Sequence, residues 1–139
     1  MSASPTPPGP QVAVGAVVVQ EGRLLTVRRG RPPAEGRWTI PGGRVEPGEP
    51  LLQAVAREVA EETRLSVRVG ELLGWTEHLG DRHHYVILDF LAEPVGSTEA
   101  VAGDDAAEVA WMTRAQLMEV RTTDGLLPFL EQRGVTLAP

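Results

Sequence analysis

The stretch that decides the fold covers residues 42–65, GGRVEPGEPLLQAVAREVAEETRL. Its second half carries Glu58, Glu61 and Glu62 at positions i, i+3 and i+4, which a helix places on one side. Carboxylates at this spacing repel one another and weaken an isolated helix. A bound divalent cation removes the repulsion, and ligands that are all oxygen suit Mg²⁺ or Mn²⁺ better than zinc. The pattern therefore predicts a helix that binds a metal.

The same stretch predicts how this helix is held. An apolar stripe beside the acidic side consists of Leu52, Val55, Ala56 and Val59. Such a stripe favours a helix that is docked on a core. Residues 41–48 contain three glycines and two prolines, which predict a tight loop whose backbone comes close to a ligand. The carbonyl of Gly43 is a candidate metal ligand there, because no side chain obstructs it.

Eight residues of this stretch resemble the signature of the Nudix hydrolases, G-x5-E-x7-R-E-U-x-E-E-x-G-U with U aliphatic. They are Gly43, Glu49, Arg57, Glu58, Val59, Glu61, Glu62 and Leu65. The one departure is Arg64, which stands where the family has glycine. A glycine there ends the helix in a left-handed turn, so we expect Arg64 to change the helix exit without loss of the chemistry.

The resemblance implies a fold and an activity. The fold is an α/β class, an α/β/α sandwich with a mixed sheet flanked by helices. The activity is Mg²⁺- or Mn²⁺-dependent hydrolysis of a pyrophosphate bond in a nucleoside di- or triphosphate derivative, by water attack at phosphorus. More than one ion is expected, because three carboxylates exceed the charge of one Mg²⁺. The alternatives are a Nudix-fold module that senses a nucleotide with weak or no catalysis, and an acidic interaction domain that binds no metal.

Roles follow for the residues that match the signature. We expect Glu58, Glu61 and Glu62 to hold the metal. We interpret Arg57 and Glu49 as an ion pair that fixes the loop against the helix, so that changing either disturbs the metal geometry indirectly. Contact of Arg57 with phosphate is the alternative.

A general base or a further metal ligand is expected from outside the helix. The acidic segment GDDAAEVAW, residues 103–111, is the candidate source. Glu108 is the first candidate in it, and Asp104 and Asp105 compete with it. A solvated turn capped by Asp is the structural alternative for all three.

Contacts to the substrate are expected from residues before the glycine loop and from the few aromatic residues. Arg37 and Arg28 are candidates for binding phosphate or a distal group. Trp38 and Tyr85 are candidates for stacking on a nucleobase, although core packing is the usual role of such rings.

The substrate is not defined by subfamily patterns that lie outside the signature. Asp81 stands where members that cleave ADP-ribose tend to have proline, and Tyr85 lies a few positions later than the tyrosine of diadenosine-polyphosphate members. A coenzyme A pattern is only partly matched by residues 24–28, LLTVR. ADP-ribose-type substrates and nucleoside triphosphates therefore both stay open.

Composition limits the classes of function. The chain has 139 residues, 42% of them hydrophobic, which fits one domain over residues 11–139 after a disordered Pro-rich tail at 1–10. Its net charge of -6 argues against binding to nucleic acid or membranes, so the expected partner is a small nucleotide. All thirteen basic residues are Arg, which favours contacts to phosphate or reflects a GC-rich genome. The absence of Cys and of a signal-peptide pattern predicts a cytoplasmic protein. A homodimer that pairs through exposed hairpins stays open.

Apolar patterning and turn residues predict the remaining elements. They are, in chain order, a hairpin of strands over 11–20 and 23–29, a short strand over 38–40, a hairpin over 66–77 and 82–93, a strand over 106–112, and helices over 114–120 and near 125–132. Thr113 and Gln116 form a capping-box pattern for the first of these helices, and Pro128 is tolerated only in the first turn of the second.

Overall fold

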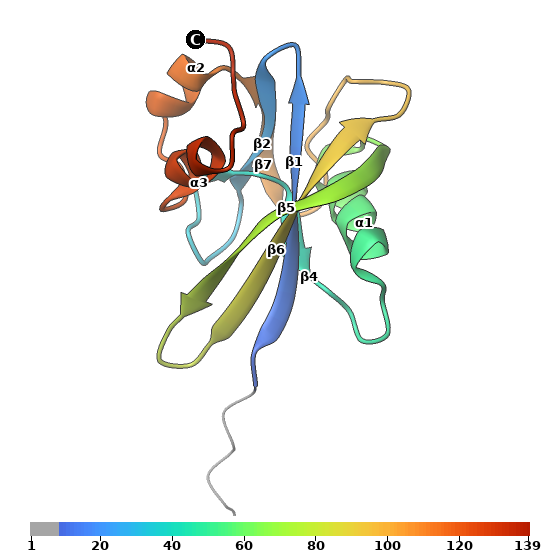
Figure 1. Ribbon diagram of the computed structural model, residues 1–139, viewed down its shortest axis with the longest axis vertical. Coiled ribbons are helices and arrows are strands. Elements are labelled where there is room, and N and C mark those ends of the chain that lie inside the picture. The colour runs from blue at the N-terminus through green and yellow to red at the C-terminus, as the bar shows by residue number, and fades with distance from the viewer. Residues whose placement is uncertain (1–8) are drawn as a thin grey trace, which may run out of the picture.

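The computed structural model describes residues 9–139 of the chain (Figure 1). All but two residues of the predicted tail at 1–10 thus lie outside the described residues. The elements are β1 (Gln11–Gln20), β2 (Arg23–Arg29), β3 (Trp38–Thr39), β4 (Gly42–Arg44), α1 (Leu51–Thr63), β5 (Val67–Leu79), β6 (His84–Pro94), β7 (Ala106–Met112), α2 (Arg114–Met118) and α3 (Leu126–Gln132).

Strand β1 is the centre of a mixed sheet. It pairs antiparallel with β2 and β4 and parallel with β6, while β5 adds to β6, and β3 and β7 add to β2. The run Val14–Val18 of β1 is buried throughout, as expected for a strand that is covered on both faces. The two hairpins and the last strand predicted from the sequence are confirmed.

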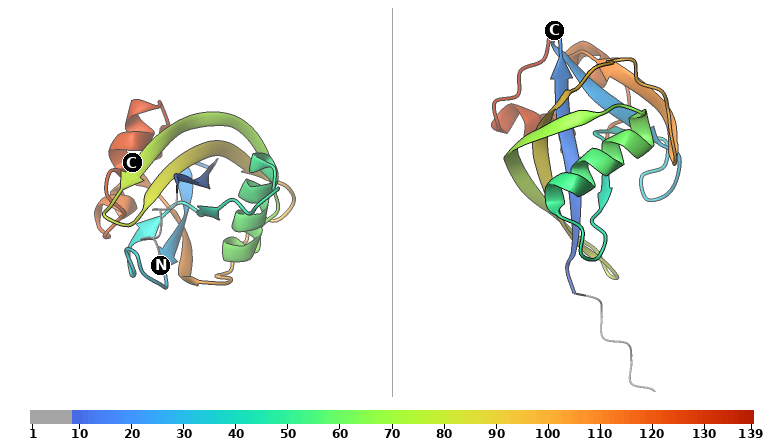
Figure 2. Two further views of the ribbon diagram at one scale, coloured as in Figure 1. Left: turned by 90° about the horizontal axis from the view of Figure 1, so that it is seen from below. Right: turned by 90° about the vertical axis from the view of Figure 1, so that its right-hand side faces the viewer.

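Helices cover the two faces of the sheet (Figure 2). On one face, α1 packs with Val14, Ala16 and Val18 in a first hydrophobic core. On the other face, α2 and α3 pack with Val17 and Leu24 in a second core. Successive residues of β1 therefore pack in different cores, because successive side chains of a strand point to opposite faces of the sheet. The predicted α/β/α sandwich with a mixed sheet is confirmed.

Helix α1 docks with a different side than the predicted apolar stripe. Its fully buried residues are Ala54, Val55, Val59 and Thr63. Leu52 lies in the first turn and is 49% exposed, and Ala56 is only half-buried, so these two assignments are corrected. The docked side is rotated toward Glu58 and Glu62. Each of these acids stands three or four residues from a buried residue and therefore lies on the same side of the helix.

The helix exit keeps the geometry that glycine usually supplies. Arg64 is in the left-handed region, with φ 62° and ψ 15°, and its N–H donates to the carbonyl of Ala60 at 3.0 Å. The expected change of exit at Arg64 is therefore wrong, because this residue accepts the unfavourable backbone conformation.

A loop from a distant part of the chain satisfies the last carbonyls of α1. The N–H groups of Val101, Gly103 and Asp104 donate to the carbonyls of Thr63, Glu62 and Glu61 at 2.9 to 3.0 Å. Side chains cannot approach this closely, since a Cβ at Gly103 would overlap the carbonyl oxygen of Glu61. The start of the acidic segment 103–111 is thus docked on the last turn of the helix.

Residues 41–48 are only partly a loop, which corrects the prediction. Gly42–Arg44 forms β4 and pairs antiparallel with β1, with Gly42 opposite Gly15 and Gly43 opposite Val14. A Cβ at Gly42 would overlap the backbone oxygen of Val14, so glycine is what allows this close pairing. The turn before α1 is confined to the residues after β4.

The C-terminal helices follow their predicted signals. The N–H of Gln116 donates to Oγ1 of Thr113, and the N–H of Thr113 donates to Oε1 of Gln116, so the capping box is confirmed. The helix it opens ends at Met118, two residues earlier than predicted. Pro128 lies in the first turn of α3.

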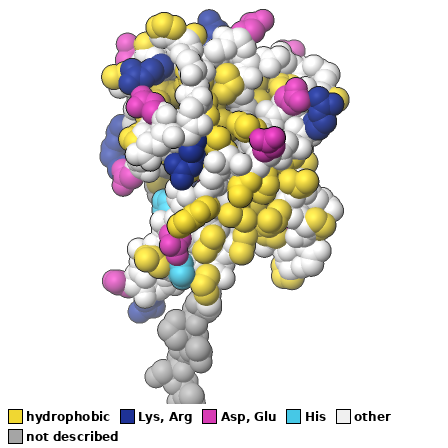
Figure 3. All heavy atoms as spheres, viewed as in Figure 1, with side chains coloured by type: hydrophobic (Ala, Val, Ile, Leu, Met, Phe, Trp, Pro, Cys, Tyr) yellow, Lys and Arg dark blue, Asp and Glu magenta, His cyan; other side chains and the backbone are white. Residues whose placement is uncertain are grey.

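In the view of Figure 3, hydrophobic side chains gather on the visible face, from the middle of the molecule downward. On β5, the exposed fractions are 49% for Leu72, 57% for Trp75 and 72% for Leu79. No helix in residues 9–139 has the length and apolar character needed to cross a membrane. A homodimer that uses these strands stays a prediction.

Candidate active site

The ion pair between Arg57 and Glu49 joins the turn to the helix. Nε of Arg57 donates to Oε2 of Glu49 at 2.6 Å, and Nη2 donates to Oε1 at 2.9 Å. Glu49 also accepts a hydrogen bond from the N–H of Glu46 at 3.0 Å. The Arg57 hydrogen bonds, followed by the one from Glu46, lower the pKa of Glu49 to about 2. The predicted contact between these two residues is present in the structure.

Arg57 also contacts two of the three glutamates of the helix. Its Nη1 donates to Oε1 of Glu58 at 2.9 Å and lies 3.3 Å from both carboxylate oxygens of Glu61. The side chain of Glu58 is 14% exposed and that of Glu61 is 44% exposed. Burial raises the pKa of Glu58, against the opposing effect of Arg57. The guanidinium therefore occupies the space between these two acids.

Glu62 approaches the glycine strand. Its Oε1 accepts a hydrogen bond from the N–H of Gly42 at 2.9 Å. Burial raises the pKa of Glu62 to about 8, although the Gly42 hydrogen bond opposes the shift, and the charge of Glu58 adds to it. Two partly desolvated carboxylates therefore lie together against β4.

Gly43 leaves room for Glu58. A Cβ at Gly43 would overlap all three atoms of the Glu58 carboxylate. The bare backbone of β4 and the acid side of α1 thus face each other directly. This contact gives a physical reason for glycine at position 43, which the sequence alone could only place in a loop.

The donor set fits a hard divalent cation. Glu58, Glu61 and Glu62 supply only oxygen atoms, and the backbone at Gly43 is unobstructed. Within residues 9–139, no three acidic or His side chains converge around one point that could hold an ion, and Nη1 of Arg57 lies between Glu58 and Glu61 and contacts both. Burial disfavours the ionised forms of Glu58 and Glu62, and a bound cation would reverse that effect.

The side chains of the three acids of segment 103–111 each contact an arginine, although the backbone N–H of Asp104 donates to the carbonyl of Glu61 on α1. Asp104 contacts Arg64 at 3.8 Å, and Asp105 contacts Arg31 at 2.7 Å. Glu108 contacts Arg28 at 2.7 Å and is 58% exposed.

The alternation of side chains along β7 explains which way Glu108 points. Ala110 and Met112 lie two and four residues after Glu108, on the same face of β7, and pack in the second core. Val109 and Trp111 lie on the other face and pack in the first core. Glu108 therefore points to the face opposite α1. The structure does not bring it to the acidic helix, although the sequence made it the first candidate for the base.

The candidate substrate contacts are dispersed. Arg28 is paired with Glu108, and Arg37 is paired with Asp124 at 2.9 Å. Trp38 is 9% exposed and packs in the second core, so packing rather than base stacking is the role that the structure gives it. Tyr85 is half-buried near the start of β6, with its ring 5.4 Å from that of His83.

Two features of this region were missed by sequence reasoning. One is the docking of residues 101–104 on the end of α1, for which the sequence carries no local signal. The other is Asp89, a 6% exposed acid within the apolar strand β6. Its signal was available, because a lone carboxylate in the run VILDFLA contradicts the strand pattern.

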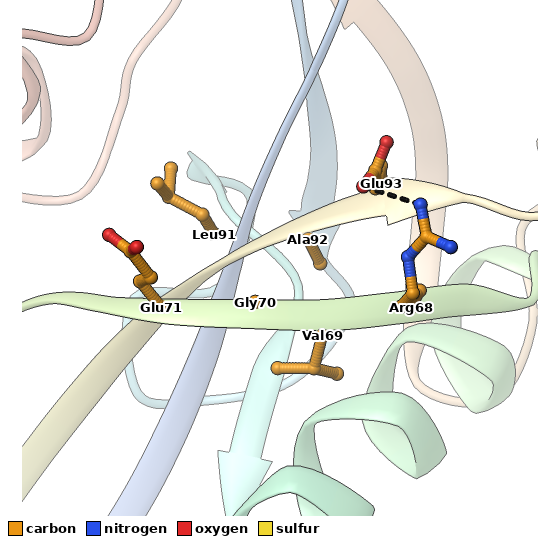
Figure 4. Close-up of a pocket in the computed structure, with 7 residues that line it drawn as sticks. All are labelled: Arg68, Val69, Gly70, Glu71, Leu91, Ala92 and Glu93. Carbon is orange, nitrogen blue, oxygen red and sulfur yellow. Dashed lines mark hydrogen bonds and ion pairs between the residues drawn. The ribbon is translucent and has the colours of Figure 1, made fainter.

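A separate hollow lies between β5 and β6 (Figure 4). It is lined by Arg68, Val69, Gly70, Glu71, Leu91, Ala92 and Glu93. Arg68 and Glu93 form an exposed ion pair across it at 2.8 Å. None of the residues that surround the acidic cluster lines this hollow, so we assign it no part in the candidate site.

Fold and site together define a class: an α/β/α protein whose glutamate-bearing helix packs against a glycine edge strand. Comparisons with known proteins agree. A family model described as NUDIX domain matches residues 9–132. The chain is 38% identical over 101 residues to the ADP-ribose pyrophosphatase of Methanocaldococcus jannaschii, covering 71% of this chain and 59% of the relative. It is 39% identical over 115 residues to a MutT-like protein of Streptomyces ambofaciens, covering 82% and 71%.

A solved structure is also similar. The MutT NUDIX hydrolase from Burkholderia pseudomallei matches with a TM-score of 0.76 at 30% identity, covering 90% of this chain and 98% of that chain. The chain therefore belongs to the Nudix hydrolase family. The resemblance noted from residues 42–65 is confirmed.

Proposed function

We propose that this protein is a Mg²⁺- or Mn²⁺-dependent enzyme that hydrolyses a pyrophosphate bond in a nucleoside di- or triphosphate derivative. One observation carries the proposal. Glu58 and Glu62, two partly buried carboxylates of one helix, lie against the bare glycine backbone of β4 at Gly43 and Gly42. The family and the relative named as an ADP-ribose pyrophosphatase support the same chemistry.

Glu58, Glu61 and Glu62 would hold the cation, with the carbonyl of Gly43 as a further oxygen ligand. When bound, one or more such ions neutralise the charge of a diphosphate and make water more acidic. Glu61 is more exposed than Glu58, so its side chain is free to turn toward an ion. The backbone carbonyl needs no movement of a side chain.

Arg57 and Glu49 would act as positioning residues. Glu49 holds the guanidinium with two hydrogen bonds, and the guanidinium in turn holds Glu58 and the backbone carbonyl of Arg44 at 3.1 Å. The turn, β4 and α1 are thereby joined at one side chain. Loss of this joint would shift the carboxylates without removing any of them.

The substrate class is a small nucleotide, and both ADP-ribose-type compounds and nucleoside triphosphates are candidates. The chain spans 59% of the length of the archaeal relative, so that protein's activity is a guide and not an assignment. We propose the cytoplasm as the compartment, because the chain has no Cys and therefore no disulfide that would need an oxidising compartment.

A product-resolved hydrolysis screen tests the proposal. Purified protein with Mg²⁺ is incubated with ADP-ribose, dinucleoside polyphosphates, NADH, sugar nucleotides and oxidised nucleoside triphosphates. We expect mononucleotide or pyrophosphate release from at least one of them, and loss of that release in a Glu61→Gln, Glu62→Gln double variant. Tight binding of a nucleotide without any product would instead identify a nucleotide sensor. Absence of both Mn²⁺ uptake and nucleotide binding would leave an acidic interaction domain.

A further inference from the structure

Asp89 is a buried acid in the middle of an apolar strand. Only 6% of it is exposed. Its neighbours Leu88 and Phe90 pack in the first core, so Asp89 points to the opposite face of the sheet, which α3 helps to cover. An ionised carboxylate in such surroundings is unfavourable unless a partner compensates it. Packing alone therefore does not account for this residue.

The carboxyl of Asp89 has no hydrogen-bond partner within residues 9–139. Burial raises its pKa to about 6, and the charge of Arg133 lowers it, with no hydrogen bond contributing. In the same residues, every side-chain polar atom that is fully shielded from solvent has a partner. The unpaired oxygens of Asp89 thus keep contact with solvent. A carboxyl that can accept hydrogen bonds is thus reachable by solvent, with the charge of Arg133 nearby but no hydrogen bond to it.

Glycines on the two neighbouring strands make room at this position. Gly15 of β1 and Gly74 of β5 are the register partners of Asp89. A Cβ at Gly15 would overlap Oδ1 of Asp89, and a Cβ at Gly74 would overlap Nε of Arg133. Arg133 follows α3 and lies 4.0 Å over the ring of Phe129. The carboxyl therefore leans over β1, and the guanidinium lies over β5.

The same row leads to the acidic helix. Gly42 of β4 is the register partner of Gly15, and its N–H donates to Glu62 at 2.9 Å. Gly42, Gly15 and Asp89 thus stand side by side on three adjacent strands. Neighbouring strands are about 4.8 Å apart, so Asp89 lies about 10 Å from Gly42. Among the described strands β4 pairs only with β1, so its other edge is free, and a ligand beside the glutamates on the α1 side would reach Asp89 on the opposite face over that edge.

We propose that Asp89 is a specificity-determining residue whose carboxyl accepts a hydrogen bond from an amino group of the substrate's nucleobase. The inference rests on the proposed function, which places the diphosphate beside Glu58 and Glu62. A nucleoside would then extend from Gly42 along the row to Asp89. Cδ1 of Ile40 lies 3.0 Å from the Cβ position of Gly15 and offers an apolar contact to a flat base.

The acceptor chemistry predicts which bases are preferred. An ionised carboxylate accepts hydrogen bonds and cannot donate them, so it pairs with an amino group and repels a carbonyl oxygen. Adenine differs from hypoxanthine, and cytosine from uracil, by the replacement of an amino group with a carbonyl. These two pairs therefore isolate the interaction.

The test compares kcat/KM for both pairs in the unmodified protein, in Asp89→Asn and in Glu93→Gln. Glu93 is the matched control, because it is an exposed acid on the same strand that pairs with Arg68. We expect the unmodified protein and Glu93→Gln to prefer the amino member of at least one pair by tenfold or more. Asp89→Asn should abolish or reverse that preference. Each ratio uses one preparation, so it does not depend on the folded fraction.

Three results would overturn the proposal. They are no preference in the unmodified protein, a change of less than twofold in Asp89→Asn, and an equal loss on every base, which would indicate a contact to sugar or to packing. If no nucleotide is hydrolysed, the proposed function fails, and Asp89 is then tested by equilibrium binding of AMP against IMP and of CMP against UMP. Loss of an amino-base preference in Asp89→Asn would support Asp89 without catalysis, and unchanged ratios would reject it.

Discussion

Arg57 holds both carboxylate oxygens of Glu49, through Nε at 2.6 Å and Nη2 at 2.9 Å. This two-point contact leaves Nη1 directed at Glu58 and Glu61, so one planar group connects the turn before α1 with the acids on it. A lysine could not reproduce this arrangement, because an ammonium group is a point charge without the fork geometry.

Replacing Arg57 by Lys should therefore lower kcat by about 10- to 100-fold, as loss of a group that orients metal ligands does. Secondary structure should be unchanged by circular dichroism. Arg68→Lys is the control, because Arg68 forms an exposed pair with Glu93 away from the site. Full activity in Arg57→Lys would show that the two-point contact is dispensable.

Glu61→Gln should lower kcat by about a hundredfold or more, since it removes a charged ligand while its exposed side chain contributes little to packing. Glu108→Gln should change kcat by less than about threefold, because Glu108 faces away from α1 and pairs with Arg28. Steady-state kinetics with saturating Mg²⁺ checks both. A large loss in Glu108→Gln would restore its assignment as the base.

Gly43→Ala should weaken Mg²⁺ or Mn²⁺ binding, because the added Cβ would displace the Glu58 carboxylate. Gly70→Ala is the matched control, since its Cβ would meet only the carbonyl of Leu91 at 3.4 Å. We expect the apparent metal affinity of Gly43→Ala to fall by tenfold or more in a Mn²⁺ titration, and that of Gly70→Ala to be unchanged. Equal affinities would mean that the contact between β4 and Glu58 is not part of the metal site.

Arg64→Gly should stabilise the fold by about 1 kcal/mol, because Arg64 has a left-handed backbone conformation that costs an L-residue free energy. For a chain of this size the midpoint of thermal unfolding would rise by roughly 3 °C. Arg64→Ala is the control, since it removes the side chain but keeps the strained backbone. A similar rise in both variants would instead attribute the effect to the side chain.

The stability of the protein should depend on pH through Asp89. Burial raises its pKa from 3.8 to about 6, so the native state holds this proton more tightly than the unfolded chain. Its contribution to the free energy of unfolding therefore falls as pH rises through this range and stays low above it. Asp89→Asn should be more stable than the unmodified protein by roughly 2–3 kcal/mol at pH 7, and by much less near pH 4. Urea unfolding of both proteins across this range measures the difference, and a constant difference would show that Asp89 is not desolvated.

Much of the fold and part of the site follow from local patterns. The alternation in the strands, the capping box at Thr113 and the spacing of Glu58, Glu61 and Glu62 depend on neighbours within a few residues, so sequence periodicity reports them. The buried arc of α1 was only half predicted, because Leu52 looks identical to a core residue until the helix is laid on the sheet. The face to which Glu108 points could not be predicted for the same reason, because it depends on how β7 pairs with β2.

The sequence by itself determined the family, the acidic helix and its partner pair Arg57 and Glu49, because these depend on residue types at set spacings along one segment. Only the tertiary structure decided what meets that helix. Strand register set Gly42, Gly15 and Asp89 side by side, and the docking of residues 101–104 closed the end of α1. Such contacts join residues that lie far apart in the chain. Their energy depends on how deeply the side chains are buried and how closely two backbone segments approach, and a local sequence pattern shows neither.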